Sequence, residues 1–545
     1  MITFSSYFDT AFLVLFLPVS VAVYMILPRQ NLRRVWLLLC SLFFFWCDGK
    51  GLLVFILLST LFMHHGGLWL GKLQNELDAA LTDLPKEEKK AVRERFKKRK
   101  RLVLAFFIAL ELGMLAVLKY AGFFVNNLNG LMGLFSSGTR FIVPHFLLPM
   151  GISFYTMQAM SYLFDVYRGK LAPDTNIGRL LLYMSFFPNI MEGPICRWSD
   201  TAESLWNAER VTYERLTRGA QRILWGMVKK IVIADRLNPF VQNVFGGYDV
   251  MEGADLLHFD FTAYPGWVVA LAAAAFTLQL YAEFSGTMDF ALGLGEIFGV
   301  HTPENFQRPF FSLSISEFWK RWHITLGTWF RDYVFYPVSM SAPVKKLTTR
   351  ARKKLGNRFG PLAGGAVALF AVWIFNGLWH GAGWNYIFFG MYHFTLILLG
   401  NIADVVMIRF SEKTGFKRDI LPVKLFRIFR TALLVVLGEL FFRAPTLRQG
   451  FSMCGRIFTQ FITNQTVSRA AWGVDWKDAF IVGVTAAIML VVGLLQEKGK
   501  GIRERVSEKP VVLRYLFWYA VVLFLVVFGA YGAGYIPVDP MYAEF

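Results

Sequence analysis

Four long apolar runs constrain this chain more than any other feature of its sequence. They cover residues 11–27, 267–281, 479–495 and 515–532. A helix of about 20 apolar residues crosses the hydrocarbon core of a bilayer, where every backbone polar group must be paired within the protein. We therefore predict an all-α, polytopic integral membrane protein with about 10–12 membrane helices, accompanied by re-entrant or interfacial helices.

The charge content agrees with a membrane protein. Only 17% of the residues are charged, whereas soluble domains carry about a quarter. The net charge is +19, but the basic residues gather between the apolar runs, so we attribute the excess to the positive-inside rule and not to nucleic-acid binding. Neither a basic n-region nor a clear cleavage site flanks the first run, which is predicted to be a membrane helix. The cysteines lack metal-type spacing, and no metal site is expected.

The basic segments predict the topology of a single membrane domain over residues 1–545. Residues 72–101 contain 11 Lys and Arg against 6 Asp and Glu, which predicts a cytoplasmic loop that lies as an amphipathic helix near anionic lipid. Three apolar segments precede it, so the N-terminus is expected outside, and the same reasoning places the C-terminus outside. The predicted parts are N-terminal spans (1–71), the basic loop (72–101), a catalytic core (102–406), C-terminal spans (407–533) and an extracellular tail (534–545). Further cytoplasmic connections are expected at residues 209–236, 345–358, 409–430 and 498–514.

The centre of the chain mixes apolar residues with proline, glycine and charges. The stretch YMSFFPNIMEGPICRW, residues 183–198, contains Pro188, Gly193 and Pro194. A helix broken there must have its free backbone groups paired by protein or in a water-filled cavity. Charged groups at membrane depth usually face such a cavity or a partner. The candidates are Glu192, Arg197, Glu283, Asp289, Glu317, Arg321, Arg331 and Asp332.

His323 lies in the densest of these polar stretches, residues 316–334. If the stretch is one helix, Glu317 can pair with Lys320 or Arg321, and His323 lies on a neighbouring face with Trp319 one turn before it. The alternative is an interfacial helix with snorkelling basic residues and an aromatic belt.

His380 lies in IFNGLWHGAGWNY, between two tracts that are each long enough for a helix. The neighbouring Asn376, Gly377 and Gly381 allow the backbone to turn and a substrate to approach closely. Imidazole, whose ordinary pKa is near neutrality, is the usual proton acceptor in acyl transfer. His393 is expected to be a packed or interfacial side chain.

Common catalytic motifs of soluble enzymes are absent. The sequence contains no GxSxG elbow, HExxH pair or P-loop. The remaining candidate is a site in the membrane that is built around histidines. Two classes of protein are compatible with such a site: an enzyme, or a proton-coupled transporter or flippase in which histidines relay protons. No internal repeat of the kind common in transporters is visible.

Several long blocks resemble the membrane-bound O-acyltransferase family. WHITLGTWFRDYVFYPV is followed by GLWHGAGWNYIFFGMYH, so that 57 residues separate His323 from His380. Other similar blocks are LPMGISFYTMQAMSYLFDVYRGK, FFPNIMEGPICRW, YAEFSGTMDFALGLGEIFG and PENFQRPFFSLSISEFWKRWH. The resemblance is nearly full length and greatest to the branch that contains the membrane proteins of alginate O-acetylation and teichoic-acid D-alanylation. It implies a ring of helices around a central funnel.

The resemblance also implies roles for individual residues. His380 matches the main catalytic histidine of the family, and His323 matches the second active-site position. Substrate-binding or supporting roles are expected for Asn376, Trp379, Trp319, Arg321, Arg331, Asp332, Glu192, Arg197 and Glu283. The sequence departs from the family pattern at two positions: Glu283 replaces an expected Asp, and Glu192 is unusual in the block FFPNIMEGPICRW. Both changes are expected to affect the polarity of the cavity.

The expected reaction moves an acyl group, most simply acetyl from acetyl-CoA, across a bacterial plasma membrane to a cell-surface polysaccharide. No permanently bound cofactor is expected. The terminal sequence PMYAEF resembles an ending whose tyrosine carries the acyl group, so Tyr542 is a candidate relay to an extracellular, esterase-like transferase; the alternative is an ordinary tail residue. D-alanyl transfer from a carrier protein to teichoic acid is the second enzymatic candidate.

Overall fold

The computed structural model describes residues 4, 6–82, 84–135, 140–246, 249–252, 255–258, 260–464, 467–499, 501–531, 535 and 537–538. The described elements are helical except for one antiparallel hairpin, in which β1 (Asp249–Glu252) pairs with β2 (Asp255–His258). The all-α prediction is therefore confirmed. The chain forms two compact units: the first contains Met1–Ala220 and Ala291–Pro303, and the second contains Gln221–Phe290 and Glu304–Val538.

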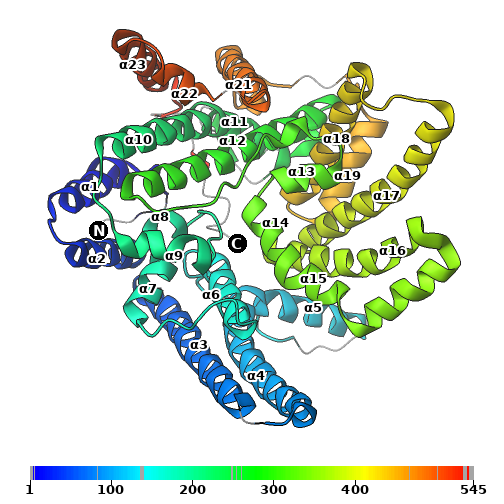
Figure 1. Ribbon diagram of the computed structural model, residues 1–545. Helices are drawn as coiled ribbons and strands as arrows, with labels where there is room; N and C mark the ends of the chain where they lie inside the picture. The colour runs from blue at the N-terminus through cyan, green and yellow to red at the C-terminus, as the bar shows by residue number, and fades with distance from the viewer. Residues whose placement is uncertain are drawn as a thin grey trace. The chain divides into compact units, whose positions relative to one another are not determined.

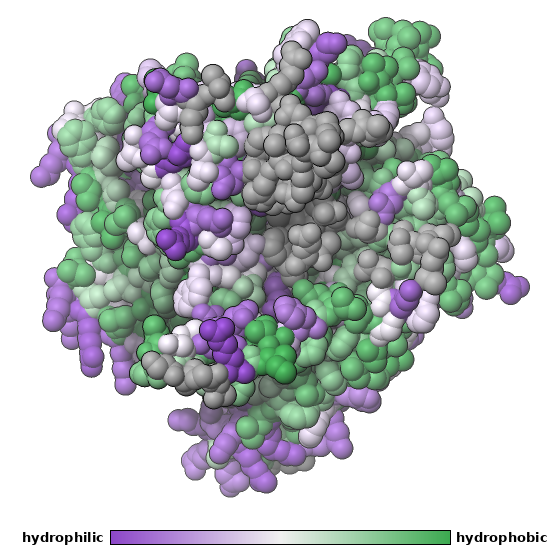
Figure 2. All heavy atoms as spheres, turned by 180° about the vertical axis from the view of Figure 1, so that it is seen from behind, coloured by the Kyte–Doolittle hydropathy of each residue, from purple (hydrophilic) through white to green (hydrophobic). Residues whose placement is uncertain are grey.

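Seven helical segments are long and apolar enough to cross a membrane, judged by length and composition of the described residues. They are Lys50–Thr82, Lys86–Leu134, Gly266–Phe298, Ala342–His380, Trp384–Thr414, Trp476–Glu497 and Val511–Phe528. Figure 2 shows hydrophobic side chains over large areas of one face, as expected for a surface in contact with lipid. The polytopic architecture is confirmed. Among the described residues the number that meets both criteria is below the expected 10–12, because α1 (Leu17–Ile26) is too short and because α2 (Gln30–Gly49, 20 residues) and α18 (Leu421–Arg443, 23 residues) are long enough but less apolar.

The first unit begins with three helices where three apolar segments were predicted. Of these described helices, only the third, within Lys50–Thr82, is long and apolar enough to cross a membrane, while Phe12–Ile26 is a shorter apolar helix. A π-helical turn (Phe12–Phe16) leads into α1 (Leu17–Ile26), and α2 (Gln30–Gly49) and α3 (Leu53–Thr82) follow. The basic segment 72–101 is not a separate surface helix. It forms the end of α3 and the start of α4 (Lys86–Leu115), which lie side by side in Figure 1, because its Lys, Arg, Glu and Ala residues favour continued helix and Pro85 directly precedes α4. The remaining helices are α5 (Ala121–Leu134), α6 (Ile152–Tyr167), α7 (Ile177–Ser185), α8 (Phe187–Ile190) and α9 (Trp198–Asn207).

The predicted break within residues 183–198 is present in this unit. Helix α7 ends at Ser185, and the chain from α8 to α9 is buried in protein. The Tyr183 hydroxyl donates to the carbonyl of Cys196 (2.7 Å), and the Tyr7 hydroxyl donates to the carbonyl of Phe187 (2.8 Å). Side chains of the protein thus pair backbone groups that the break sets free, as the bilayer requires.

The second unit contains both candidate histidines. Two helices, α10 (Tyr213–Met227) and α12 (Gly266–Phe298), have residues in both units. The others are α11 (Asp235–Phe245), α13 (Ile315–Arg321), α14 (Ile324–Phe330), α15 (Tyr336–Ser339), α16 (Ala342–His380), α17 (Trp384–Thr414), α18 (Leu421–Arg443), α19 (Leu447–Thr459), α20 (Arg469–Trp472), α21 (Trp476–Glu497), α22 (Ile502–Ser507) and α23 (Val511–Phe528). Short π-helical segments cover Val228–Ala234 and Arg331–Phe335.

Helices α16 and α17 pack closely through glycines and form the hairpin that carries His380. A Cβ atom on Gly377 would lie 2.5 Å from the carbonyl oxygen of Tyr386, and one on Gly390 would overlap the carbonyl of Trp373. Small residues that let two backbones approach are typical of helix pairs in membranes. The hairpin therefore fixes the place of His380, three residues after Gly377.

The chain after α23 is hydrogen-bonded to buried charged side chains of the same unit. Lys230 pairs with Asp235 (2.5 Å), and these two side chains bond the backbone oxygen and nitrogen of Val538 at 2.7 and 2.8 Å. Arg236 contacts Asp478, the Tyr535 hydroxyl (3.0 Å) and the carbonyl of Phe528 (2.6 Å). We conclude that the described part of the C-terminal segment is anchored.

Candidate active site

The polar stretch 316–334 is interrupted at His323, so the prediction of one continuous helix is wrong. Helix α13 ends at Arg321, and α14 begins at Ile324, with His323 at φ 46° in the left-handed region that residues other than glycine seldom adopt. Asn305 stabilises this turn. Its backbone oxygen accepts from the N–H of Ile324 (3.0 Å), and its side-chain oxygen accepts from the N–H of Thr325 (3.0 Å). A residue distant in sequence therefore overrides local helix propensity.

His323 is buried, with 2% of its surface exposed. Its Nδ1 atom lies 3.2 Å from Oδ1 of Asn305, and its ring lies edge-on to Phe284 of α12 with a centroid separation of 4.8 Å. Burial, and to a lesser extent positive charge on His380, holds the pKa of His323 well below its ordinary value. The ring is consequently neutral near pH 7, with one nitrogen that donates and one that accepts.

His380 is the last residue of α16 and is 5% exposed. Its ring centroid lies 4.9 Å from Trp379, 5.8 Å from Phe389 and 5.2 Å from Phe442. Gly381 follows, where a Cβ atom would overlap the ring of Tyr386. His380 thus sits at the junction between α16 and α17, in an aromatic surround that strengthens electrostatic interactions by excluding water.

Trp379 links the two candidate histidines. Its indole lies 5.6 Å from the ring of His323 and 4.9 Å from the ring of His380, measured between centroids. The two imidazoles come from different elements, the α13–α14 turn and the end of α16. The structure therefore places both within one small aromatic region of the second unit.

A third histidine, His393, is packed close by on α17. The Trp319 indole N–H donates to its Nδ1 (3.2 Å), and its ring stacks on Trp373 at 5.4 Å. Phe389 contacts both His393 (4.6 Å) and His380 (5.8 Å). The packed alternative expected for His393 agrees with this position. Trp319 contacts His393. The sequence predicted a continuous helix with Trp319 one turn before His323.

Two further predicted residues are buried near the histidines. Asn376 lies one turn before His380 on α16, and in the part of the chain that the structure describes its Oδ1 has no hydrogen-bond partner. Glu283 precedes Phe284 on α12, and the Thr287 hydroxyl donates to it at 3.4 Å. A buried amide oxygen without a protein partner is costly unless a ligand or water pairs it, so Asn376 is a polar group available to a substrate.

Two of the predicted arginines, Arg321 and Arg331, have carboxylate partners. Arg321 pairs with Glu317 (2.7 Å), as helical spacing predicts, and with Glu497 (3.1 Å). Arg331 has a side chain that is 53% exposed and pairs with Asp332 (2.8 Å). These contacts place the arginines in ion pairs and not against the imidazoles.

Three predicted residues are not part of this region of the second unit. Glu192 and Arg197 belong to the first unit, in the buried break between α8 and α9. Tyr542 lies outside the described residues.

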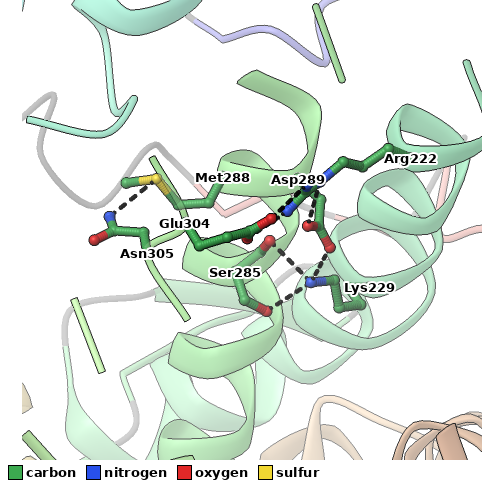
Figure 3. A network of polar contacts seen from close by, with 7 residues as sticks. All are labelled: Arg222, Lys229, Ser285, Met288, Asp289, Glu304 and Asn305. Atoms are coloured by element: carbon green, nitrogen blue, oxygen red, sulfur yellow. Dashed lines mark hydrogen bonds and ion pairs between the residues drawn. The ribbon is translucent and has the colours of Figure 1, made fainter. Parts of the chain in front are cut away.

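Sequence reasoning missed Asn305 and a buried ionic network (Figure 3). Residues 209–236, expected to be a basic connection, are helical from Tyr213 onward and bury Lys229, Lys230 and Arg236. Lys229 pairs with Asp289 of α12 at 2.6 Å. The sequence did not predict that these charges are buried; Lys230 pairs with the nearby Asp235, whereas Lys229 and Arg236 pair with Asp289 and Asp478, which are distant in sequence. An acidic residue within the membrane, such as Asp289, predicts a basic partner, but the sequence alone does not identify which basic residue that is.

Comparison with known proteins defines the class as a multi-pass membrane acyltransferase. The profile of the membrane-bound O-acyltransferase family matches residues 171–351, which include His323. The chain is 32% identical over 453 residues to the probable alginate O-acetylase AlgI of Azotobacter vinelandii, covering 83% of this chain and 77% of the relative. It is 27% identical over 472 residues to the peptidoglycan O-acetyltransferase of Helicobacter pylori, covering 81% and 77%.

A shorter match, 30% identical over 265 residues, joins it to the teichoic acid D-alanyltransferase of Bacillus subtilis, covering 48% and 61%. The chain belongs to the membrane-bound O-acyltransferase family. It is therefore an O-acyltransferase, and the transporter and flippase alternatives are set aside.

Proposed function

We propose that this enzyme transfers an acetyl group from a cytosolic thioester, acetyl-CoA, toward O-acetylation of a cell-surface polysaccharide. The observation that carries the proposal is the pair of buried imidazoles, His323 and His380, against one tryptophan in a chain with extensive similarity to alginate O-acetylases. Similarity to the D-alanyltransferases covers 48% of the chain, against 83% for the alginate relatives. Acetyl transfer is therefore favoured over D-alanyl transfer.

His380 is the proposed general base. It takes the proton of an acceptor hydroxyl while the oxygen attacks the thioester carbonyl carbon. The tetrahedral intermediate collapses with cleavage of the carbon–sulfur bond, and the proton passes from His380 to the leaving thiolate, which leaves as free CoA. His323 orients the acceptor or stabilises the oxyanion. Positioned proton transfer of this kind contributes roughly 10²–10⁴ in rate.

Asn376, close to His380, and Arg331, which does not lie against the imidazoles, supply binding contacts in this proposal. Asn376 presents its buried side-chain oxygen one turn from His380. Arg331, being half exposed, exchanges its Asp332 partner for a phosphate oxygen of the donor, a charge-assisted contact that suits a guanidinium. The donor enters from the cytosol and only the acyl group crosses, so the charged coenzyme never passes through the membrane.

Tyr542 is the proposed acyl relay. The anchored segment supports this idea, because Val538 packs against a cluster that contains Ala282 of α12, the helix whose Phe284 contacts His323. We place the protein in a bacterial plasma membrane with both termini outside, where an esterase-like transferase receives the acetyl group.

The donor is tested with purified enzyme in lipid nanodiscs. Free CoA should appear from acetyl-CoA, whereas a D-alanyl-carrier thioester should remain intact. Turnover of the D-alanyl carrier alone would overturn acetyl transfer and leave the family assignment in place.

The relay is tested by intact-protein mass spectrometry after incubation with isotopically labelled acetyl-CoA. We expect one acetyl group on the wild type, mapped to Tyr542, and none on Tyr542→Phe. Full polysaccharide acetylation by Tyr542→Phe in cells would remove the relay without affecting the assignment of the enzyme.

A further inference from the structure

The side chain of Asn305 holds three polar groups through one oxygen. Its Oδ1 accepts from the backbone N–H of Thr325 (3.0 Å) and from the Thr325 hydroxyl (3.0 Å), and it lies 3.2 Å from Nδ1 of His323. All three residues are buried. Asn305 is therefore a central contact of the turn that carries His323.

These contacts determine where the His323 proton resides. A backbone N–H can only donate, so the Asn305 atom that faces Thr325 must be the carbonyl oxygen and not the amide nitrogen. An amide oxygen can only accept, so Nδ1 of His323 must be the nitrogen that carries hydrogen. In the neutral ring the lone pair then resides on Nε2.

The amide itself is held in this orientation from the other side. Its Nδ2 atom donates to the sulfur of Met288 on α12 at 3.1 Å (Figure 3). The amide nitrogen of Asn305 donates to Met288, and the amide oxygen accepts from Thr325, so both contacts require the same orientation of the amide. The assignment thus rests on both ends of the side chain.

The backbone on which Asn305 stands is fixed by the ionic network of Figure 3. Glu304 binds Arg222 through two hydrogen bonds of 2.8 and 2.6 Å, and Arg222 also binds Asp289 at 3.1 Å. Asp289 pairs with Lys229 at 2.6 Å, and Lys229 donates to the carbonyl and hydroxyl of Ser285 at 2.8 and 2.9 Å. Lys229, Arg222 and Asp289 are largely buried, whereas Glu304 is half exposed. Loss of one largely buried member leaves another without its partner, which favours the paired geometry.

We propose that Asn305 is a positioning residue that fixes His323 as the tautomer with hydrogen on Nδ1, so that Nε2 accepts a hydrogen bond from the acceptor substrate. This inference rests on the proposed function of His323 and decides between its two roles. A neutral ring with a lone pair on Nε2 cannot donate from that atom to an oxyanion, whereas it can orient a hydroxyl group. His323 therefore binds the acceptor.

The tautomer is measured directly by nitrogen NMR of enzyme labelled with ¹⁵N-histidine in nanodiscs. The His323 signals are assigned as those lost in His323→Gln. We expect a protonated Nδ1 and an unprotonated Nε2 at neutral pH. A protonated Nε2 in the wild type would overturn the proposal whatever the activity of the enzyme.

Substitutions at Asn305 give the kinetic readout. Asn305→Leu removes the acceptor and should lower kcat roughly 10- to 100-fold, the effect of one lost buried hydrogen bond. Asn305→Asp keeps an acceptor for both Thr325 and His323 and should retain the tautomer and most of kcat. Equal loss in both variants, with the wild-type tautomer retained in Asn305→Leu, would contradict a positioning role.

A matched control is Asn243→Leu, which removes a buried amide that bonds the carbonyl of Ala471 on α20. Its stability should fall while the His323 signals stay unchanged. Failure of the proposed function is recognised separately. If His323→Gln retains full acetyl transfer, the catalytic role of His323 is wrong, while the NMR result still decides the tautomer.

Discussion

Gly377→Ala tests whether the close packing of α16 on α17 sets the position of His380. The new Cβ atom would lie 2.5 Å from the Tyr386 carbonyl oxygen, whereas real Cβ contacts essentially never fall below 3.0 Å. The two helices must therefore separate locally by about 0.5 Å or more, and overpacking of this kind destabilises by roughly 1–3 kcal/mol. His380 lies three residues further along α16 and would move with the helix.

The expected effect on catalysis is larger than the effect on stability. A displacement of about 1 Å at a reacting group can lower a rate about 100-fold, so we expect a decrease in kcat of roughly 10- to 100-fold in Gly377→Ala. Turnover is measured as free CoA released from acetyl-CoA by enzyme in nanodiscs, and thermal unfolding is followed in parallel. The measurement thus separates misplacement of His380 from loss of folded protein.

Gly365→Ala is the matched control on the same helix. A Cβ atom there would meet nothing within 4 Å. Alanine is favoured over glycine within a helix by about 1 kcal/mol, so this variant should be as stable as the wild type or slightly more so, with unchanged turnover. Equal activities for Gly377→Ala and Gly365→Ala would refute the argument that this glycine contact positions the base.

Three further predictions concern buried polar contacts. Asp289→Asn leaves cations without their carboxylate and should lower the free energy of unfolding by about 3–5 kcal/mol, measured by thermal unfolding; an unchanged Tm would contradict the network. Trp319→Phe removes the hydrogen bond to His393 and should cost about 1–3 kcal/mol, whereas a stable variant would show that this contact is dispensable. Arg236→Met should expose the C-terminal segment to chymotrypsin at Tyr535, and a cleavage rate equal to that of the wild type would argue against the anchor.

Features that depend on nearby residues were accessible from the sequence. Apolar run length predicted the long helices Gly266–Phe298, Trp476–Glu497 and Val511–Phe528, whereas the run 11–27 forms a shorter helix. Pro188 and Gly193 predicted the break within 183–198, and the glycines around His380 predicted a helix junction. In each case the physical cause lies within a few residues of the feature.

Features that depend on distant partners were not accessible. His323 adopts a left-handed backbone because Asn305, from a separate segment, pairs the turn that follows it. From the sequence, Lys229 was assigned to a basic connecting segment. In the structure it forms an ion pair with Asp289 of α12. A single sequence contains the charges but not their pairing, so neither contact could be derived from spacing.

The direct test of the central claim is a single-turnover measurement of acetyl transfer by His380→Gln. Enzyme in nanodiscs is mixed with labelled acetyl-CoA and quenched, and released CoA is measured beside His301→Gln, which replaces an exposed histidine of the first unit. The account predicts wild-type release for His301→Gln and a loss of roughly 10²–10⁴ for His380→Gln, with both proteins folded. CoA release by His380→Gln at the wild-type rate would contradict the role of His380 as the base.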